Sequence, residues 1–191
     1  SIGAAELFID PENPVTGDRL QAILKFKDDS TIEHAFTYVW LINGEKVQES
    51  AAPALGKPVK CDDFVELQVK VAGDESQDPA LTRSTFVGNA APSLRLLNQS
   101  LDETGRYQAE LEVSDLERDA VQLLLKNSPP GMTINPQLST VQWSVGPEQQ
   151  GAFEVSVAAR DSRGAETLLS YQIKVSREKS ERKEKNEASP S

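Results

Sequence analysis

The sequence predicts an all-β protein made of two tandem β-sandwiches and a charged C-terminal tail. Five short segments between residues 105 and 176 carry apolar residues at every second position, and turn-forming residues separate them. About six further segments of the same kind precede residue 88 at the spacing typical of sandwiches, and no stretch has a convincing helical period. A period of two places successive side chains on opposite faces, so each segment can bury one face and expose the other.

In the first half, proline and turn residues separate the expected strands. Ala4 to Ile9 is a short edge strand stopped by prolines, and the dipeptide Asn43-Gly44 predicts a tight hairpin. The expected strands of this half are residues 4–9, 17–27, 36–42, 45–48, 65–71 and 81–87.

In the second half, a first strand over Leu94 to Leu97 is followed by a polar turn over Asn98 to Gly105. Each of the five strands after that turn is marked by an alternating apolar set: Tyr107, Ala109, Leu111 and Val113; Val121, Leu123 and Leu125; Val141, Trp143 and Val145; Phe153, Val155, Val157 and Ala159; Leu169, Tyr171, Ile173 and Val175.

These patterns divide the chain into four parts. Residues 1–87 form the first sandwich, the small and proline-terminated stretch 88–92 is a linker, and residues 93–176 form the second sandwich. Residues 177–191 are rich in charge and almost free of apolar side chains, so they cannot join a core. We expect a disordered tail or linker there, although its i, i+4 charge pairs also suit a frayed helix.

Composition narrows the classes of partner. Thirty acidic and twenty basic residues give a net charge of −10, which argues against nucleic acid or an anionic membrane surface as a partner. No apolar run approaches the roughly 20 residues that span a bilayer, and the first residues lack signal-peptide character. The single cysteine, Cys61, excludes an intramolecular disulfide, and we expect it to be a partly buried structural thiol.

Catalytic motifs are absent from the sequence. The one histidine, His34, has no neighbouring serine or cysteine that suggests a triad, and no second histidine or cysteine pair offers a metal set. No nucleophile elbow or phosphate loop occurs either. The prediction is therefore a non-enzymatic protein.

The run from Pro14 to Gly44 resembles the bacterial Ig-like and PKD-like modules of surface proteins. The resemblance rests on Thr16-Gly17-Asp18 before a strand and on Tyr38-x-Trp40-x-x-Asn43-Gly44 after it. On periodicity alone, either face of the strand over residues 36–42 could be the buried one. The resemblance implies that Trp40 packs inside.

The second unit resembles the cadherin-like "putative Ig" module related to dystroglycan. The turn Ser128-Pro129-Pro130-Gly131-Met132 before a strand that carries Trp143 is the more specific signature, and residues 151–161 with Gly164 continue it. Trp143 is in phase with the other apolar residues of its strand, and we expect it in the core.

Calcium-binding cadherin repeats place acidic clusters at module junctions, because Ca²⁺ takes six to eight oxygen ligands. The linker here carries no such cluster, and Leu116 and Arg118 interrupt Asp115, Glu117 and Asp119. The tripeptide 11–13 (Pro-Glu-Asn) resembles a cadherin ligand motif, but we expect it at the far end of the first unit. Calcium is therefore not predicted at the junction.

Two acidic turns of the first unit are the preferred interaction site. In an Ig-like topology both turns emerge at one end of the sandwich. Their carboxylates would raise one another's pKa values and attract a cation. Two readings stay open: a solvated rim, or a patch that binds a basic partner or, weakly, Ca²⁺. The six partner-binding candidates are Asp28, Asp29, Glu33, Asp74, Glu75 and Asp78, of which Asp28, Asp29, Asp74 and Asp78 are the metal candidates.

Together these features predict a non-enzymatic, extracytoplasmic binding, adhesion or spacer protein that acts through contacts with another envelope or surface protein. No cofactor is expected beyond weak Ca²⁺. The alternative is an accessory carbohydrate-binding segment of a larger envelope or secreted enzyme, which would bind a polysaccharide through an exposed aromatic row. A third option is a subunit of a periplasmic complex without a ligand of its own.

Overall fold

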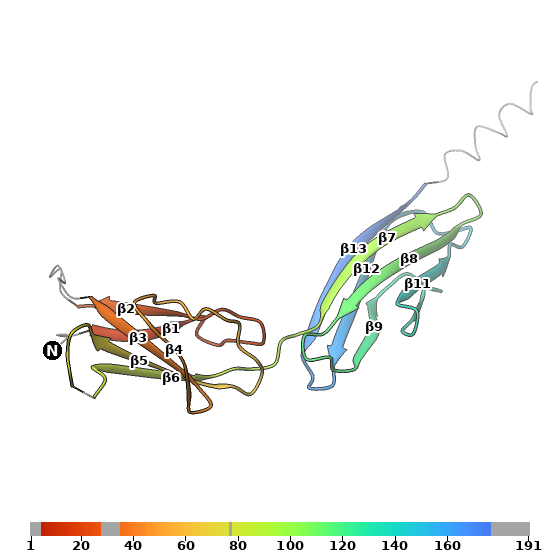
Figure 1. Ribbon diagram of the computed structural model, residues 1–191. Helices are drawn as coiled ribbons and strands as arrows, with labels where there is room; N and C mark the ends of the chain where they lie inside the picture. The colour runs from red at the N-terminus through yellow and green to blue at the C-terminus, as the bar shows by residue number, and fades with distance from the viewer. Residues whose placement is uncertain (1–4, 28–34, 77, 177–191) are drawn as a thin grey trace, which may run out of the picture. The chain divides into compact units, whose positions relative to one another are not determined.

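The computed structural model describes residues 5–27, 35–76 and 78–176. The chain divides into two compact units between Ala90 and Ala91. Figure 1 shows that the described residues of each unit form layers of strands. Among these residues there is no helix of the length and apolarity needed to cross a membrane.

The described residues of the first unit form six strands in two sheets. Strand β1 (Ala5–Asp10) pairs with β2 (Gln21–Phe26) in a two-stranded sheet. The second sheet has the order β4-β3-β5-β6, with β3 (Phe36–Ile42), β4 (Glu45–Ser50), β5 (Phe64–Val71) and β6 (Leu81–Phe86). All described pairings in this unit between named strands are antiparallel.

The second unit is a sandwich of two antiparallel sheets. One sheet has the order β10-β11-β8-β7, with β7 (Ser93–Leu101), β8 (Arg106–Ser114), β10 (Thr133–Asn135) and β11 (Thr140–Ser144). The other has the order β13-β12-β9, with β9 (Val121–Asn127), β12 (Gly151–Asp161) and β13 (Glu166–Val175). The predicted all-β fold with two sandwiches is confirmed.

Each unit has a core of its own, supplied by the alternating residues. In the first unit Trp40 is fully buried, and Phe36, Tyr38 and Ile42 pack against the same core. In the second, Trp143 is 2% exposed and its ring lies edge-on to that of Phe153. The predicted core positions of both tryptophans are confirmed, and the face of β3 that carries Trp40 is the core face.

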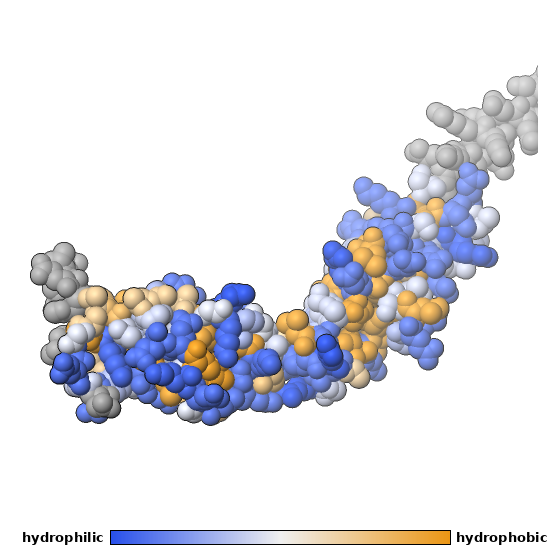
Figure 2. Space-filling view, in the orientation of Figure 1, coloured by the Kyte–Doolittle hydropathy of each residue, from blue (hydrophilic) through white to orange (hydrophobic). Residues whose placement is uncertain are grey.

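The visible surface is mainly polar on one face of the molecule (Figure 2). On the face shown in Figure 2, hydrophilic residues predominate and apolar ones gather in small groups. The large apolar side chains that stay exposed are Ile23, Phe86, Leu97, Leu101, Leu116, Leu138 and Leu168.

Several strand boundaries differ from the prediction: β4 continues to Ser50, and the short strand β10 was not predicted. The strand expected over 17–27 begins only at Gln21, because Gly17 has a φ of 91° and its N–H donates to the Val59 carbonyl in a turn. The strand expected over Leu94 to Leu97 continues to Leu101 after an irregularity in register near Leu97. Its polar continuation lacks an apolar alternation, but β8 supplies the backbone partners that extend it.

The predicted location of the 11–13 tripeptide is wrong. Val15, close after it, forms a parallel bridge with Gly88, and the Gly88 N–H donates to the Pro14 carbonyl at 2.8 Å. Tertiary pairing therefore places this loop at the end where the chain leaves the first unit.

Candidate functional site

The predicted acidic rim of the first unit is only partly covered by the structure. Asp28, Asp29 and Glu33 lie outside the described residues, as does His34. Asp74, Glu75 and Asp78 are all exposed in the segment between β5 and β6. Within the described part of the chain, the carboxylates grouped closely enough to hold a metal ion lie elsewhere.

The structure contradicts the electrostatic expectation at Asp74. The Ser76 N–H donates to Asp74 Oδ1 at 3.0 Å, and this hydrogen bond lowers the pKa of the Asp74 carboxyl below its ordinary value, with a further contribution from the Ser76 side chain. A hydrogen bond to the charged form favours that form. At this position the local turn therefore outweighs any repulsion from neighbouring carboxylates.

The closest grouping of carboxylates lies in the second unit and consists of Asp115, Asp119 and Asp161, which we call the acidic cluster. One oxygen from each residue lies within 4.8 Å of the others. Asp115 and Asp119 belong to the turn between β8 and β9, and Asp161 ends β12. The pairing of Asp161 with Val121 in β9 places these two segments side by side.

The first turn is shaped by the Asp115 side chain. Its Oδ1 accepts hydrogen bonds from the backbone N–H groups of Glu117 and Asp119, each at 3.0 Å. Arg118 takes a positive φ of 60°, and its N–H donates to the Asp115 carbonyl. This arrangement leaves the second carboxylate oxygen of Asp115 unused by the turn.

The turn after β12 is held in the same way, by an aspartate that accepts backbone hydrogen bonds. Asp161 is 4% exposed, and its Oδ1 accepts hydrogen bonds from the N–H groups of Arg163 and Ala165, each at 2.9 Å. Gly164 has a φ of 91°, a conformation that a residue with a Cβ rarely adopts. The same end of the unit holds the start of β7, because Ser93 pairs with Ser114.

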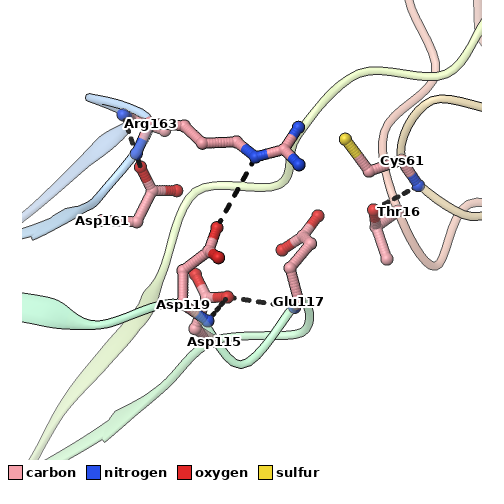
Figure 3. Close-up of polar contacts among 8 residues, drawn as sticks. Thr16, Cys61, Asp115, Glu117, Asp119, Asp161 and Arg163 are labelled. Carbon is pink, nitrogen blue, oxygen red and sulfur yellow. Dashed lines mark hydrogen bonds and ion pairs between the residues drawn. The ribbon is translucent and has the colours of Figure 1, made fainter.

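Two oxygens of the acidic cluster are buried without a hydrogen-bond partner among the described residues: Asp115 Oδ2 and Asp119 Oδ2. Arg163 Nε lies 3.8 Å from Asp119 Oδ2, an ion-pair distance beyond that of a hydrogen bond. Figure 3 shows Glu117 in the turn that carries Asp115 and Asp119. Its carboxylate points toward the Arg163 side chain.

This donor set fits a hard divalent cation. Carboxylate oxygens are the ligands that Ca²⁺ prefers, and buried oxygens without a donor are costly unless a positive charge compensates them. In the sequence, Leu116 and Arg118 interrupt the acidic residues, and a grouped site was therefore not expected there. That expectation is wrong, because the carboxylates of Asp115 and Asp119 lie together with that of Asp161. Leu116 and Arg118 are both exposed, so the alternation directs them outward and the aspartates inward.

The remaining sequence candidates form no grouped site in the described part of the chain. Trp40 is fully buried. Carbohydrate binding would need an exposed row of aromatic side chains, and β3 does not present one. Cys61 is half-buried, and its N–H donates to Thr16 Oγ1 at 2.8 Å within the first unit. The sequence analysis did not include Asp161 among the candidate site residues. The stretch Asp-Ser-Arg-Gly that begins at Asp161 is typical of a tight turn and was the one signal that could have indicated it.

No family model and no curated protein matches the chain. Solved structures that match include the fibronectin(III)-like modules of CbhA from Clostridium thermocellum, at 15% identity, with 89% of this chain and 94% of that chain covered and a TM-score of 0.35. The human desmocollin-1 ectodomain matches at 12% identity over 88% of this chain and 36% of its own, with a TM-score of 0.38.

The two-domain immunoglobulin module of the Drosophila receptor protein tyrosine phosphatase DLAR matches at 13% identity, with 91% and 99% of the two chains covered and a TM-score of 0.31. These proteins belong to the immunoglobulin, cadherin and fibronectin III classes of β-sandwich. The fold assignment for this chain rests on its own strands and cores.

Proposed function

We propose that this chain is a non-enzymatic, extracytoplasmic protein that acts through protein contacts, as an adhesion or spacer module, and that its second sandwich binds Ca²⁺ at the acidic cluster. The observation that carries the calcium proposal is the grouping of Asp115, Asp119 and Asp161, with two buried oxygens that lack hydrogen-bond donors. The tandem sandwiches and the net charge of −10 support a contact role away from nucleic acid.

Asp115, Asp119 and Asp161 would hold the ion. The Oδ1 atom of Asp115 already accepts backbone hydrogen bonds, so its Oδ2, together with Asp119 Oδ2, would be a ligand. A bound Ca²⁺ supplies two positive charges where three carboxylates converge. It would thereby join the turn after β8 to the turn after β12 and stabilise this end of the sandwich.

The acidic rim of the first unit remains a prediction for a partner-contact surface. Asp74, Glu75 and Asp78 are exposed, and clustered acids attract a Lys- and Arg-rich partner whose association slows as salt rises. We do not adopt the carbohydrate-binding alternative, since the aromatic side chain on which it depended, Trp40, is buried.

The decisive experiment compares thermal unfolding with calcium and with a chelator for the full chain and for the triple variant Asp115→Asn, Asp119→Asn, Asp161→Asn. Asparagine Oδ1 can still accept the turn hydrogen bonds, so the variant loses charge while the turns keep their geometry. At ten times its dissociation constant, calcium should raise the melting temperature of the parent by about 5 °C or more. The variant should show no shift, and in chelator it should be at least as stable as the parent.

A charge-matched control is the triple variant Asp28→Asn, Asp74→Asn, Asp78→Asn in the first unit. It removes the same number of carboxylates and should keep the calcium response. Loss of the response in this control alone would place the ion at the first-unit rim instead. A parent protein with no calcium response in melting or calorimetric titration would end the calcium proposal.

A further inference from the structure

Two phenylalanine side chains lie together on the outer face of the larger sheet of the first unit. Phe64 on β5 and Phe86 on β6 are cross-strand partners, and their ring centroids lie 4.9 Å apart at an interplanar angle of 43°. Val65, the next residue of β5, is buried in the core, so the phenylalanine pair belongs to the opposite, outward face. Phe86 is 72% exposed, the highest value among the large apolar side chains that the structure describes.

A polar hollow adjoins this pair. It has a volume of about 450 Å³ and is lined by Glu66, Thr82, Arg83 and Ser84. Glu66 and Ser84 are cross-strand partners one row along the same face from the phenylalanine pair, so the rings and the hollow form one surface. The volume lies within the range of about 300 to 1,000 Å³ that is typical of sites for small molecules.

The two charged groups of the hollow are held by their neighbours. Gln68 Nε2 donates to Glu66 Oε1 at 2.9 Å, and the Arg83 guanidinium lies over the Phe8 ring, 5.5 Å from its centroid. Within the described part of the chain neither group takes part in an ion pair. A carboxylate and a guanidinium each present polar atoms in a fixed plane, so both can form paired hydrogen bonds with a ligand.

This combination of groups fits a carbohydrate. A sugar ring has a face of C–H groups that can pack on an aromatic ring, and a rim of hydroxyls that donate and accept hydrogen bonds. Neighbouring hydroxyls match the paired atoms of Glu66 and Arg83, and the hydroxyls of Thr82 and Ser84 can donate or accept. Because the two charges of the lining cancel, the hollow offers no electrostatic advantage to a strongly charged glycan.

We propose that the Phe86 surface, formed by Phe64, Phe86 and the four residues of the hollow, binds a neutral oligosaccharide, with one sugar ring on Phe86 and the next over the hollow. This surface is separate from the aromatic row once expected on β3. Trp40 packs into the core from the opposite face of the sheet, so its burial does not affect the Phe86 surface. The proposal goes beyond protein contacts and calcium binding and depends on neither.

The test is a screen of the full chain against immobilised oligosaccharides of glucan, xylan, mannan and chitin, with heparin as the charged comparison. Calorimetric titration then measures the best binder against three variants. Phe86→Ser removes the exposed ring and should weaken binding at least about fivefold. Phe86→Tyr keeps a flat ring and should stay within about twofold of the parent. Arg83→Gln removes the charge and the paired geometry and should weaken binding about tenfold.

The matched control is Leu138→Ser, which removes an apolar side chain that is 70% exposed in the second unit. It should bind the oligosaccharide as the parent does. Because Phe86 and Arg83 are exposed, all variants should melt near the parental temperature, which separates a loss of binding from a loss of the fold.

Each outcome decides the proposal. Weaker binding by Phe86→Ser and Arg83→Gln, with parental binding by Phe86→Tyr and Leu138→Ser, supports it. Binding that is unchanged in Phe86→Ser overturns this surface as the site, and unchanged binding in Arg83→Gln overturns the role of the hollow. Binding to heparin alone overturns the neutral ligand. If no oligosaccharide binds, the proposal fails, while the proposed protein contacts and calcium binding stand.

Discussion

At the scale of single residues, the two tryptophans occupy similar core positions but differ in how their indole N–H is satisfied. Trp143 Nε1 donates to the Pro130 carbonyl at 3.2 Å. Trp40 Nε1 is buried and has no acceptor among the described residues. A buried donor without an acceptor loses its hydration and gains nothing in return.

Replacing either tryptophan by alanine should lower the free energy of unfolding of its unit by about 3 to 5 kcal/mol, as for other buried aromatics. Replacement by phenylalanine should separate the two sites. Trp143→Phe should cost about 1 kcal/mol more than Trp40→Phe, because only the first loses a hydrogen bond. Urea unfolding of the matched pair measures the difference, and an equal or larger cost at Trp40 would contradict the argument.

At the scale of elements, a polar contact joins the two sheets inside the second sandwich. The Tyr107 hydroxyl on β8 lies 3.2 Å from the Tyr171 hydroxyl on β13 and 3.0 Å from Gln99 Oε1. Burial raises the pKa of Tyr107 above its ordinary value, and its hydrogen bond with Tyr171 raises it further. Burial also raises the pKa of Tyr171.

The second sandwich should therefore lose stability in alkali. Below about pH 10 tyrosine is protonated in both the folded and the unfolded chain, so its contribution is fully present. As the pH rises further, the unfolded chain releases the proton first, and Tyr107 alone lowers the unfolding free energy by up to about 1.4 kcal/mol per pH unit.

Urea unfolding of the second unit between about pH 9 and 11.5 tests this prediction, with Tyr107→Phe as the matched variant. The phenylalanine keeps the ring in the core and removes the ionisable group, so its stability should fall less steeply with pH. Tyrosinate absorbance from Tyr107 that develops near pH 10 in a still folded protein would refute the prediction.

At the scale of the whole molecule, the chain carries two separate hydrophobic cores with one tryptophan in each. Because each core is closed by residues of its own unit, fragments 1–90 and 91–191 should both fold alone. Each fragment should show blue-shifted tryptophan emission and a cooperative urea transition. Emission typical of an exposed indole from either fragment would show that its core needs the other unit.

Local pattern accounts for most of what the sequence could predict. The alternation of apolar residues placed the strands, and the phase of Trp143 placed it in the core without any knowledge of strand pairing. Boundaries failed where backbone conformation or a pairing partner intervened, as at Gly17 and along the polar end of β7.

The sequence by itself determined the all-β class, the two sandwiches and most of the buried faces, because a period of two is a local property of the chain. For the strand over residues 36–42, periodicity left both faces open, and the structure shows that the Trp40 face is buried. Only the tertiary structure decided the site. Asp161 is far from Asp115 and Asp119 in sequence, and the register of β12 against β9 brings them together. Local periodicity carries no information about which strand pairs with which, and the charge environment of a carboxylate depends on that pairing.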